Sequence, residues 1–189
     1  MATSLDGFIG RPDGGLDWLT SNESGESGED YGYQAFLDTV DALVMGRNTF
    51  DKVMSFDQWP YSKQVVVLTN RSIELPRDIR DSIEVMSGDP QDIVDRLSEK
   101  GFHHLYVDGG RTIQQFLNAG LIQEMTITKL PVIIGEGIPL FASIENDIKL
   151  EHLSTSTYAT ASYSLDTKCC TNHRLKLVTK YRVQLSKIY

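Results

Sequence analysis

Cysteine is scarce in this chain, and long apolar runs are absent. Only two cysteines, the neighbours Cys169 and Cys170, occur in 189 residues. This usage is typical of a reducing compartment rather than of a disulfide-rich secreted scaffold. No window approaches the roughly 18 uninterrupted apolar residues of a membrane span, and the first residues carry no basic, apolar-cored leader. We therefore expect a cytoplasmic protein that does not enter a membrane.

Positive charge is also in short supply. The chain has 18 lysines and arginines against 26 aspartates and glutamates, which gives a formal net charge of −8. A general nucleic-acid binder needs a basic face, so nucleic acid is not an expected partner. An anionic small molecule can still bind where positive side chains are grouped locally. The four histidines lack the spacing of metal ligands, and we expect no metal site.

Length and hydrophobic content fit one domain. A chain of 189 residues with 40% hydrophobic residues can build a substantial core, and no linker or repeat divides it. Strand patterns alternate with helical periodicity, which predicts an α/β fold with a mostly parallel sheet and an antiparallel C-terminal edge. The expected strands are 3–9, 41–46, 64–68, 82–86, 104–107, 122–134, 148–158 and 175–188, and the expected helices are 31–40, 47–54, 89–101 and 110–119.

One stretch, residues 106–117, combines a strand, two adjacent glycines and a helix. The glycines, Gly109 and Gly110, have no Cβ and admit backbone angles that other residues avoid. The first N–H groups of the following helix can hold an anion. The stretch therefore fits a phosphate cradle, although a plain turn would use the same two glycines.

Two more strand ends carry similar chemistry. Residues 46–49 (GRNT) and 69–71 (TNR) follow expected strands, as residues 109–112 (GGRT) do. Each turn offers small residues, a hydroxyl and an arginine, which suit a phosphate. In open α/β sheets, ligands bind outside the carboxyl ends of the strands. A solvated surface charge explains any one of these arginines, but three such turns together favour a phosphorylated ligand.

Four motifs resemble the dihydrofolate reductase-like superfamily. The chain is most similar to the branch that contains the reductase domain of bifunctional riboflavin-biosynthesis deaminase-reductases and its stand-alone relatives. The match covers roughly residues 1–158 and implies the three-layer α/β fold of that family. The motifs are 4–9 (SLDGFI) with 17–19 (DWL), 46–49 (GRNT), 107–110 (VDGG), and 121–125 (LIQEM) with 131–141 (PVIIGEGIPLF).

This resemblance implies an NADPH site. In the family, the positions matching 109–112 hold the pyrophosphate, those of Arg47 and Thr49 lie along the adenosine phosphates, and the 69–71 turn borders the 2′-phosphate. Ala2 and Trp18 would flank the nicotinamide. The resemblance also leads us to expect a cis peptide bond between Gly109 and Gly110. The implied cofactor residues are Ala2, Trp18, Gly46, Arg47, Thr49, Leu68, Thr69, Asn70, Arg71, Gly109, Gly110, Arg111 and Thr112.

The group that supplies a proton or meets the substrate is less clear. In dihydrofolate reductases the acid lies on the helix before the Gly-Arg strand, and a gap-free count from Gly46 reaches Asp30. Asp30 lies in an acidic loop, however, where a solvated side chain is the better explanation. Asp108 lies directly before the Gly-Gly turn, where riboflavin-type relatives place an acidic residue near the substrate. Asp6 precedes Gly7, as aspartates that fix a turn commonly do.

The resemblance implies an NADPH-dependent oxidoreductase of the 5-amino-6-(5-phosphoribosylamino)uracil reductase type, acting on a small-molecule substrate and assembled as a homodimer. Two alternatives stay open. One is a reductase of dihydrofolate, another pterin or another small C=N or C=O compound. The other is a non-catalytic NADP-binding dimer. We expect one domain over residues 1–189, with a tail at 159–189 that departs from the family pattern.

Overall fold

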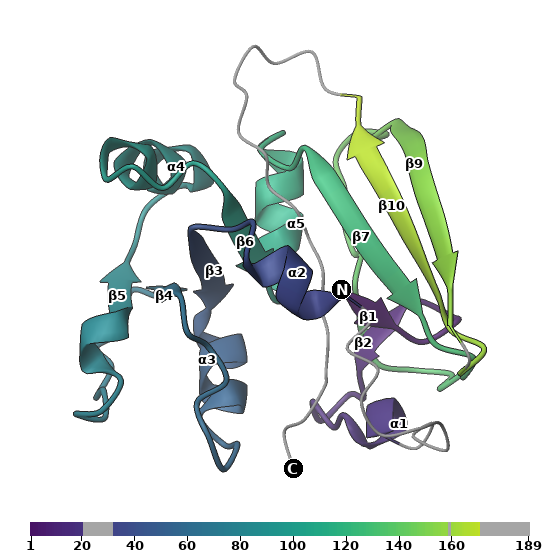
Figure 1. The fold of residues 1–189 in the computed structure, drawn as a ribbon, viewed down its shortest axis with the longest axis horizontal. Helices are drawn as coiled ribbons and strands as arrows, with labels where there is room; N and C mark the ends of the chain where they lie inside the picture. Colours follow the sequence, from purple (N-terminus) through teal and green to yellow (C-terminus); the bar gives the residue numbers. More distant parts are fainter. Residues whose placement is uncertain (21–31, 159, 171–189) are drawn as a thin grey trace.

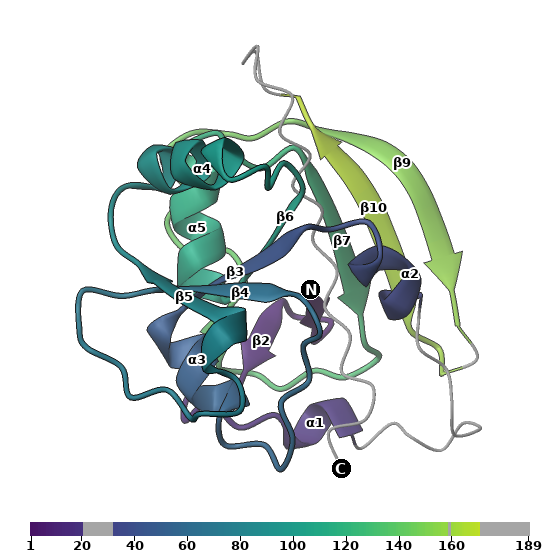
Figure 2. The same ribbon diagram turned by 60° about the vertical axis from the view of Figure 1, so that its left-hand side comes forward.

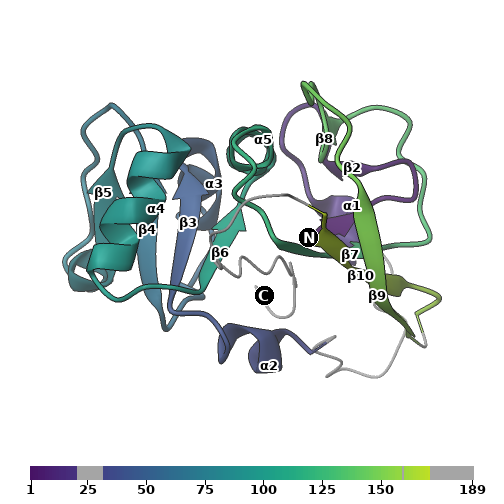
Figure 3. The same cartoon turned by 90° about the horizontal axis from the view of Figure 1, so that it is seen from above.

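The computed structural model describes residues 1–20, 32–158 and 160–170. Four parallel strands form one part of the molecule, in the order β5-β4-β3-β6 (Figure 1). The central runs of β3, β4 and β6 are buried, as in strands with both faces covered, whereas Val85 in the edge strand β5 is exposed. Figure 3 shows α5 and α2 on opposite sides of this sheet. The strands are β3 (Ala42–Gly46), β4 (Gln64–Leu68), β5 (Ile83–Met86) and β6 (Leu105–Asp108).

A second sheet is mainly antiparallel and has the order β1-β7-β10-β9. Only β1 runs parallel to its neighbour β7; β10 pairs antiparallel with β7 and with β9. Figure 2 shows β7, β10 and β9 side by side. The strands are β1 (Ala2–Thr3), β7 (Glu124–Lys129), β9 (Leu150–Thr157) and β10 (Tyr163–Cys169), and a separate ribbon pairs β2 (Phe8–Gly10) with β8 (Ile138–Pro139).

Short helices connect these strands. The longest described helix, α4, lies within the predicted range 89–101 and begins at Pro90, and the preceding Asp89 side chain makes no capping hydrogen bond. None of the helices in the described ranges has the length and apolar character of a membrane span. One hydrophobic cluster includes residues of both sheets, for example Val107 and Met125. The helices are α1 (Asp17–Thr20), α2 (Tyr33–Leu37), α3 (Arg47–Val53), α4 (Pro90–Glu99) and α5 (Gly110–Asn118), with a 3₁₀ turn at Arg80–Ser82.

The predicted α/β architecture is confirmed, with a mostly parallel sheet and an antiparallel C-terminal edge. Strand β4 has the predicted bounds, and β3 and α3 differ by one residue. The single strand expected at 3–9 is wrong: Gly7, at a φ of 93°, makes a turn between β1 and β2. Ser4 Oγ stabilises this turn by accepting a hydrogen bond from the N–H of Phe8 at 3.0 Å.

Other boundaries also need correction. The strand expected over 122–134 is only β7, because beyond Lys129 the N–H of Val132 bonds locally to Leu130 O. The segment after β7, for which no strand was predicted beyond residue 134, contains β8, and the helix expected at 31–40 is reduced to α2.

Strand β10 has no counterpart among the predicted elements. It lies in the tail that was expected to be atypical, yet it occupies the centre of the second sheet between β7 and β9. Serine, aspartate and threonine alternate with larger residues along it, so its sequence lacks the apolar run of a buried strand. The strand expected at 175–188 falls outside the described residues.

Candidate active site

Strand register brings the three predicted turns to one edge of the parallel sheet. Gly46 is opposite Leu68 across the β3–β4 pair, and Met45 is opposite Asp108 across the β3–β6 pair. The 46–49, 69–71 and 109–112 turns therefore begin side by side at the carboxyl ends of neighbouring strands. This is the position at which α/β sheets bind ligands.

Two of the turns interlock through glycine. A Cβ built on Gly109 would lie 2.2 Å from Thr49 Oγ1, and one built on Gly46 would lie 2.7 Å from Thr112 Oγ1. Contacts under 3.0 Å are essentially never made by real Cβ atoms. Each turn thus presents a threonine hydroxyl to the bare backbone of the other, which only glycine allows at both positions.

The Gly109–Gly110 peptide bond is trans, so the expected cis bond is wrong. The chain turns instead at Gly109, with a φ of 92°. Glycine reaches positive φ at no steric cost, whereas a cis bond between non-proline residues costs about 2.5–4 kcal/mol. No side chain caps the N-terminus of α5, so its first N–H groups are available to an anion.

Arg47 connects the first turn to the segment after the 69–71 turn. Its Nε donates to Asp51 Oδ1 at 2.6 Å and its guanidinium also donates to Ser72 O at 3.3 Å. Within the 69–71 turn, the N–H of Arg71 donates to Thr69 Oγ1 at 3.1 Å. This fixes the turn and leaves the Arg71 side chain exposed.

The remaining predicted cofactor residues differ in exposure. Ala2, in β1, and Trp18, in α1, are both buried. Thr112 is buried by its contact with the first turn, whereas Asn70 and Arg111 are exposed. Asp30 lies outside the described residues.

Asp108 ends β6 and lies beside the Gly-Gly turn. Its Oδ1 accepts a hydrogen bond from the N–H of Gly109 at 2.7 Å. Burial raises the pKa of the Asp108 carboxyl, against the opposing effects of that N–H and of the amino terminus. Burial also raises the pKa of Tyr33 and of Tyr61, and the Asp108 carboxylate adds to both shifts. The three groups therefore occupy one partly dehydrated region.

Asp6 has a structural role, as expected. Its carboxylate accepts hydrogen bonds from the N–H groups of Ile134 at 3.3 Å and Gly135 at 2.8 Å. A hydrogen bond from Ser4 is the main reason that the pKa of Asp6 is lowered. Asp6 thus holds the turn after β1 to the loop after β7.

Sequence reasoning missed two residues that cover the Gly-Gly turn. A Cβ on Gly110 would lie 2.8 Å from Ile9 Cδ1 and 3.3 Å from Pro139 O. The β2–β8 ribbon therefore packs directly on Gly110. Ile9 and Pro139 do belong to two of the motifs noted above. A sequence motif does not show, however, that both residues pack against Gly110.

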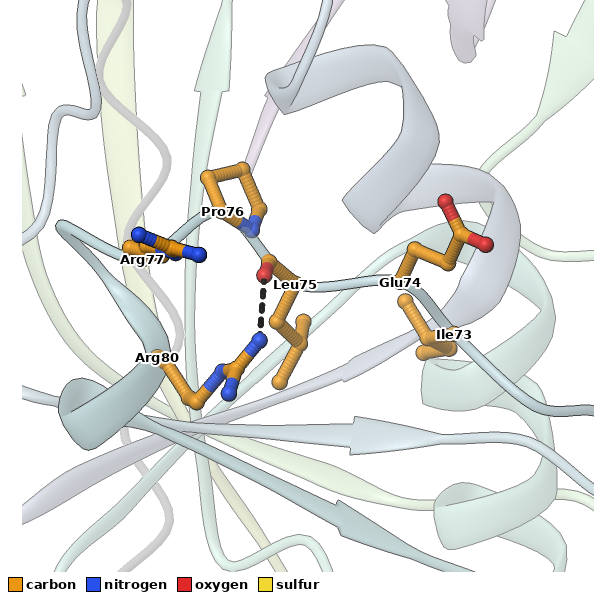
Figure 4. Close-up of a pocket in the computed structure, with 6 residues that line it drawn as sticks. All are labelled: Ile73, Glu74, Leu75, Pro76, Arg77 and Arg80. Carbon is orange, nitrogen blue, oxygen red and sulfur yellow. Dashed lines mark hydrogen bonds between the residues drawn. The ribbon is translucent and has the colours of Figure 1, made fainter.

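Two surface pockets lie away from the interlocked turns. The first, of about 500 Å³, follows the 69–71 turn in sequence and brings two arginines beside apolar side chains (Figure 4). Arg80 donates across it to Leu75 O at 3.4 Å. Its lining residues are Ile73, Glu74, Leu75, Pro76, Arg77 and Arg80. The second, of about 340 Å³, lies between Leu117 and Leu150. Neither includes a residue of the three turns.

The sequence of this chain is similar to those of known proteins. The sequence profile described as the RibD C-terminal domain matches residues 1–162. The uncharacterized protein YwjB of Bacillus subtilis strain 168 is 31% identical over 163 residues, which span 85% of this chain and 91% of YwjB.

Solved structures with a similar fold support the same relationship. The putative riboflavin biosynthesis protein of Shewanella sp. PV-4 is 41% identical with a TM-score of 0.85, over 90% of this chain and 97% of that one. Dihydrofolate reductase from Enterococcus faecalis, solved with NADP(H), shares the fold at a TM-score of 0.60 and 18% identity, over 89% of this chain and 92% of that one. The protein therefore belongs to the RibD C-terminal domain family, and it shares its fold with dihydrofolate reductase.

Proposed function

We propose that this protein is an NADPH-dependent reductase of the riboflavin-biosynthesis type. The interlocked 46–49 and 109–112 turns carry the proposal, because the packing of two threonine hydroxyls against Gly46 and Gly109 holds both turns together at the carboxyl ends of β3 and β6. Such a surface, next to the uncapped N-terminus of α5, suits pyrophosphate oxygens. Membership of a family related to reductases supports the same conclusion.

Two arginines would favour NADPH over NADH. The cofactors differ by one phosphate, which arginine recognises with several donors at once. Arg71 is exposed in the 69–71 turn, and Arg47 reaches the adjoining Ser72. Each charge-assisted contact contributes about 1.5–3 kcal/mol, so two of them would favour NADPH by roughly a hundredfold or more.

The double variant Arg47→Ala, Arg71→Ala should lose that preference. The measurement is the ratio of the NADPH and NADH dissociation constants, from fluorescence titration. Arg96→Ala is a matched control, since Arg96 also donates to a main-chain carbonyl, Ser87 O at 3.3 Å, but lies on α4. Unchanged discrimination in the double variant would contradict the placement of the 2′-phosphate.

When bound, NADPH supplies the hydride. The protein must orient the substrate and provide a proton. Asp108 is the proposed substrate contact, because it adjoins the Gly-Gly turn and burial raises the pKa of its carboxyl. The proposed reaction reduces the ribosyl group of 5-amino-6-(5-phosphoribosylamino)uracil to a ribityl chain.

Activity assays separate the candidates. NADPH oxidation is followed with the aminouracil phosphate, then dihydrofolate, then small aldehydes. Oxidation with the first compound supports the proposal, and oxidation only with another would favour a pterin or general carbonyl reductase. NADPH binding without oxidation of any of them would favour a non-catalytic NADP-binding protein.

A further inference from the structure

Three polar groups at the end of β6 have unused hydrogen-bonding capacity. Asp108 uses Oδ1 for the N–H of Gly109, and its Oδ2 accepts nothing from the described part of the chain. Over the same ranges, the hydroxyls of Tyr33 and Tyr61 have no hydrogen-bond partner. Neither hydroxyl is sealed inside the protein, since neither is among the fully buried atoms without a partner. A partly dehydrated polar group without a partner loses the hydrogen bond that water would give it.

Packing brings Tyr33 to the same side of β6 as Asp108. Phe36, one turn after Tyr33 on α2, meets Tyr106 edge to face, with ring centroids 5.2 Å apart. Tyr106 and Asp108 are two residues apart on a strand, so their side chains lie on the same face. Tyr33, three residues before Phe36, is therefore directed along α2 toward the end of β6. It packs there against the hydrophobic core.

Tyr61 reaches this region from the segment before β4. Its ring lies 5.3 Å from that of Trp59, and Trp59 in turn contacts Phe50 on α3 at 6.1 Å. This chain of aromatic contacts holds the Tyr61 ring in one orientation. The Asp108 carboxylate acts on the pKa of both phenols, and Tyr33 also acts on the pKa of Tyr61. In the described part of the chain none of the three groups is hydrogen-bonded to another, so each is open to a polar group of a ligand.

We propose that Tyr33 and Tyr61 are substrate-binding residues that act with Asp108 on one uncharged polar group of the substrate. The inference rests on the proposed function. The group must accept from the phenols and donate to the carboxylate, as a hydroxyl or a cyclic amide does. The positive group that acts on Asp108 is the amino terminus, which donates to Thr126 O at 2.7 Å. A phosphate would meet the carboxylate's repulsion, so the substrate's anionic end points elsewhere.

The first test is binding by calorimetry to protein loaded with NADP⁺. The probe is 5-amino-6-(5-phosphoribosylamino)uracil, with ribose 5-phosphate and uracil as fragments that separate the hydroxyl source from the amide source. Tyr33→Phe and Tyr61→Phe should each weaken binding of the intact probe by about three- to tenfold, the effect of losing one neutral hydrogen bond. Tyr163→Phe, at a partly exposed tyrosine on β10, should change nothing. NADPH affinity should stay at the wild-type value in all three variants.

A second readout does not depend on affinity. With 3-fluorotyrosine incorporated, the ¹⁹F signals of Tyr33 and Tyr61, assigned from the two variants, should shift when the probe binds, and that of Tyr163 should not. Probe binding that leaves both signals in place, or unweakened binding to both variants, would overturn the inference and leave the proposed function intact. Failure of the proposed function is seen separately, as absence of NADPH binding to wild type. If wild type does not bind NADPH, ribose 5-phosphate and uracil are titrated into the cofactor-free protein. If neither fragment shifts the ¹⁹F signals of Tyr33 and Tyr61, the inference is overturned in that case too.

Discussion

At the scale of single residues, Gly109 has the most constrained backbone in the candidate site. It combines a positive φ with a neighbouring hydroxyl 2.2 Å from where a Cβ would lie. Gly14 has a similar φ of 80° but nothing within 4 Å of its Cβ position. Comparing Gly109 with Gly14 therefore separates the free-energy cost of a positive φ from the free-energy cost of the steric contact.

Gly109→Ala should destabilise the protein by about 2–5 kcal/mol, from the left-handed backbone and overpacking together. Gly14→Ala should cost only the backbone part, about 1–2 kcal/mol. Urea unfolding measures both. Adding Thr49→Ala, which removes the clashing hydroxyl, should recover part of the loss in Gly109→Ala. Equal losses in the two glycine variants would show that the turns do not interlock.

Asp108 should make stability depend on pH. Because burial raises its pKa in the folded state, its contribution is fully present below the unfolded pKa and is lost as pH rises through the folded pKa. Asp108→Asn keeps an oxygen for the N–H of Gly109 and cannot ionise. The variant's free energy of unfolding, relative to wild type, should therefore increase as pH rises above the unfolded pKa of an aspartate, about 4. A difference that is constant with pH would contradict a raised pKa.

At the scale of elements, β10 is the strand that joins its sheet together. Asp166, in its middle, accepts hydrogen bonds from Thr126 on β7 and Ser154 on β9, both at 2.5 Å. Next to it, the Thr128 and Ser164 hydroxyls bond at 2.7 Å in a buried pair. Polar side chains thus connect three strands where an apolar run would normally be expected.

Replacing Asp166 should show the value of this connection. Asp166→Ala leaves two hydroxyls without their acceptor and should cost about 1–3 kcal/mol of stability. Asp166→Asn can still accept from one hydroxyl and donate to the other, so it should cost less than about 1 kcal/mol. Denaturant midpoints at one pH give the comparison. Equal stability of the two variants would mean that the hydrogen bonds of Asp166 to Thr126 and Ser154 contribute little.

The same strand shows why some of the fold could be predicted and some could not. The unbroken apolar run of β4 and the proline at the start of α4 are local signals, and both elements appear where expected. The three turns were also found, because strand, glycine and arginine are adjacent in sequence. The alternation in β10 depends on partners elsewhere in the chain. For the same reason, the packing of Ile9 on Gly110 was not foreseeable.

At the scale of the whole molecule, β9 is an edge strand that pairs only with β10 among the described residues. It ends its sheet, and all eight of its residues are exposed, including Leu150 and Leu153. Native proteins usually blunt such an edge with charge, proline or a covering segment. We therefore propose that a second copy of the chain covers it, pairing β9 with β9 in an antiparallel manner across a two-fold axis.

Leu153→Lys should convert such a dimer into a monomer, because it places a charge in the centre of the proposed contact. Sedimentation equilibrium measures the change. Leu5→Lys is the matched control, since Leu5 is 49% exposed against 48% for Leu153 but lies in the turn after β1. A wild-type protein that sediments as a monomer, or a Leu153→Lys variant that remains dimeric, would contradict this interface.

The pairing of β1 with β7 also has a consequence for synthesis on the ribosome. Met1 bonds to Thr126 across 125 residues, and the β2–β8 ribbon that covers Gly110 joins equally distant parts of the chain. The parallel strands and their turns can assemble while the chain is still emerging, because their contacts are comparatively local. The first ten residues must wait for β7 and β8 to leave the exit tunnel. Completion of the site therefore comes after the parallel strands have formed, as expected for contacts of high sequence separation.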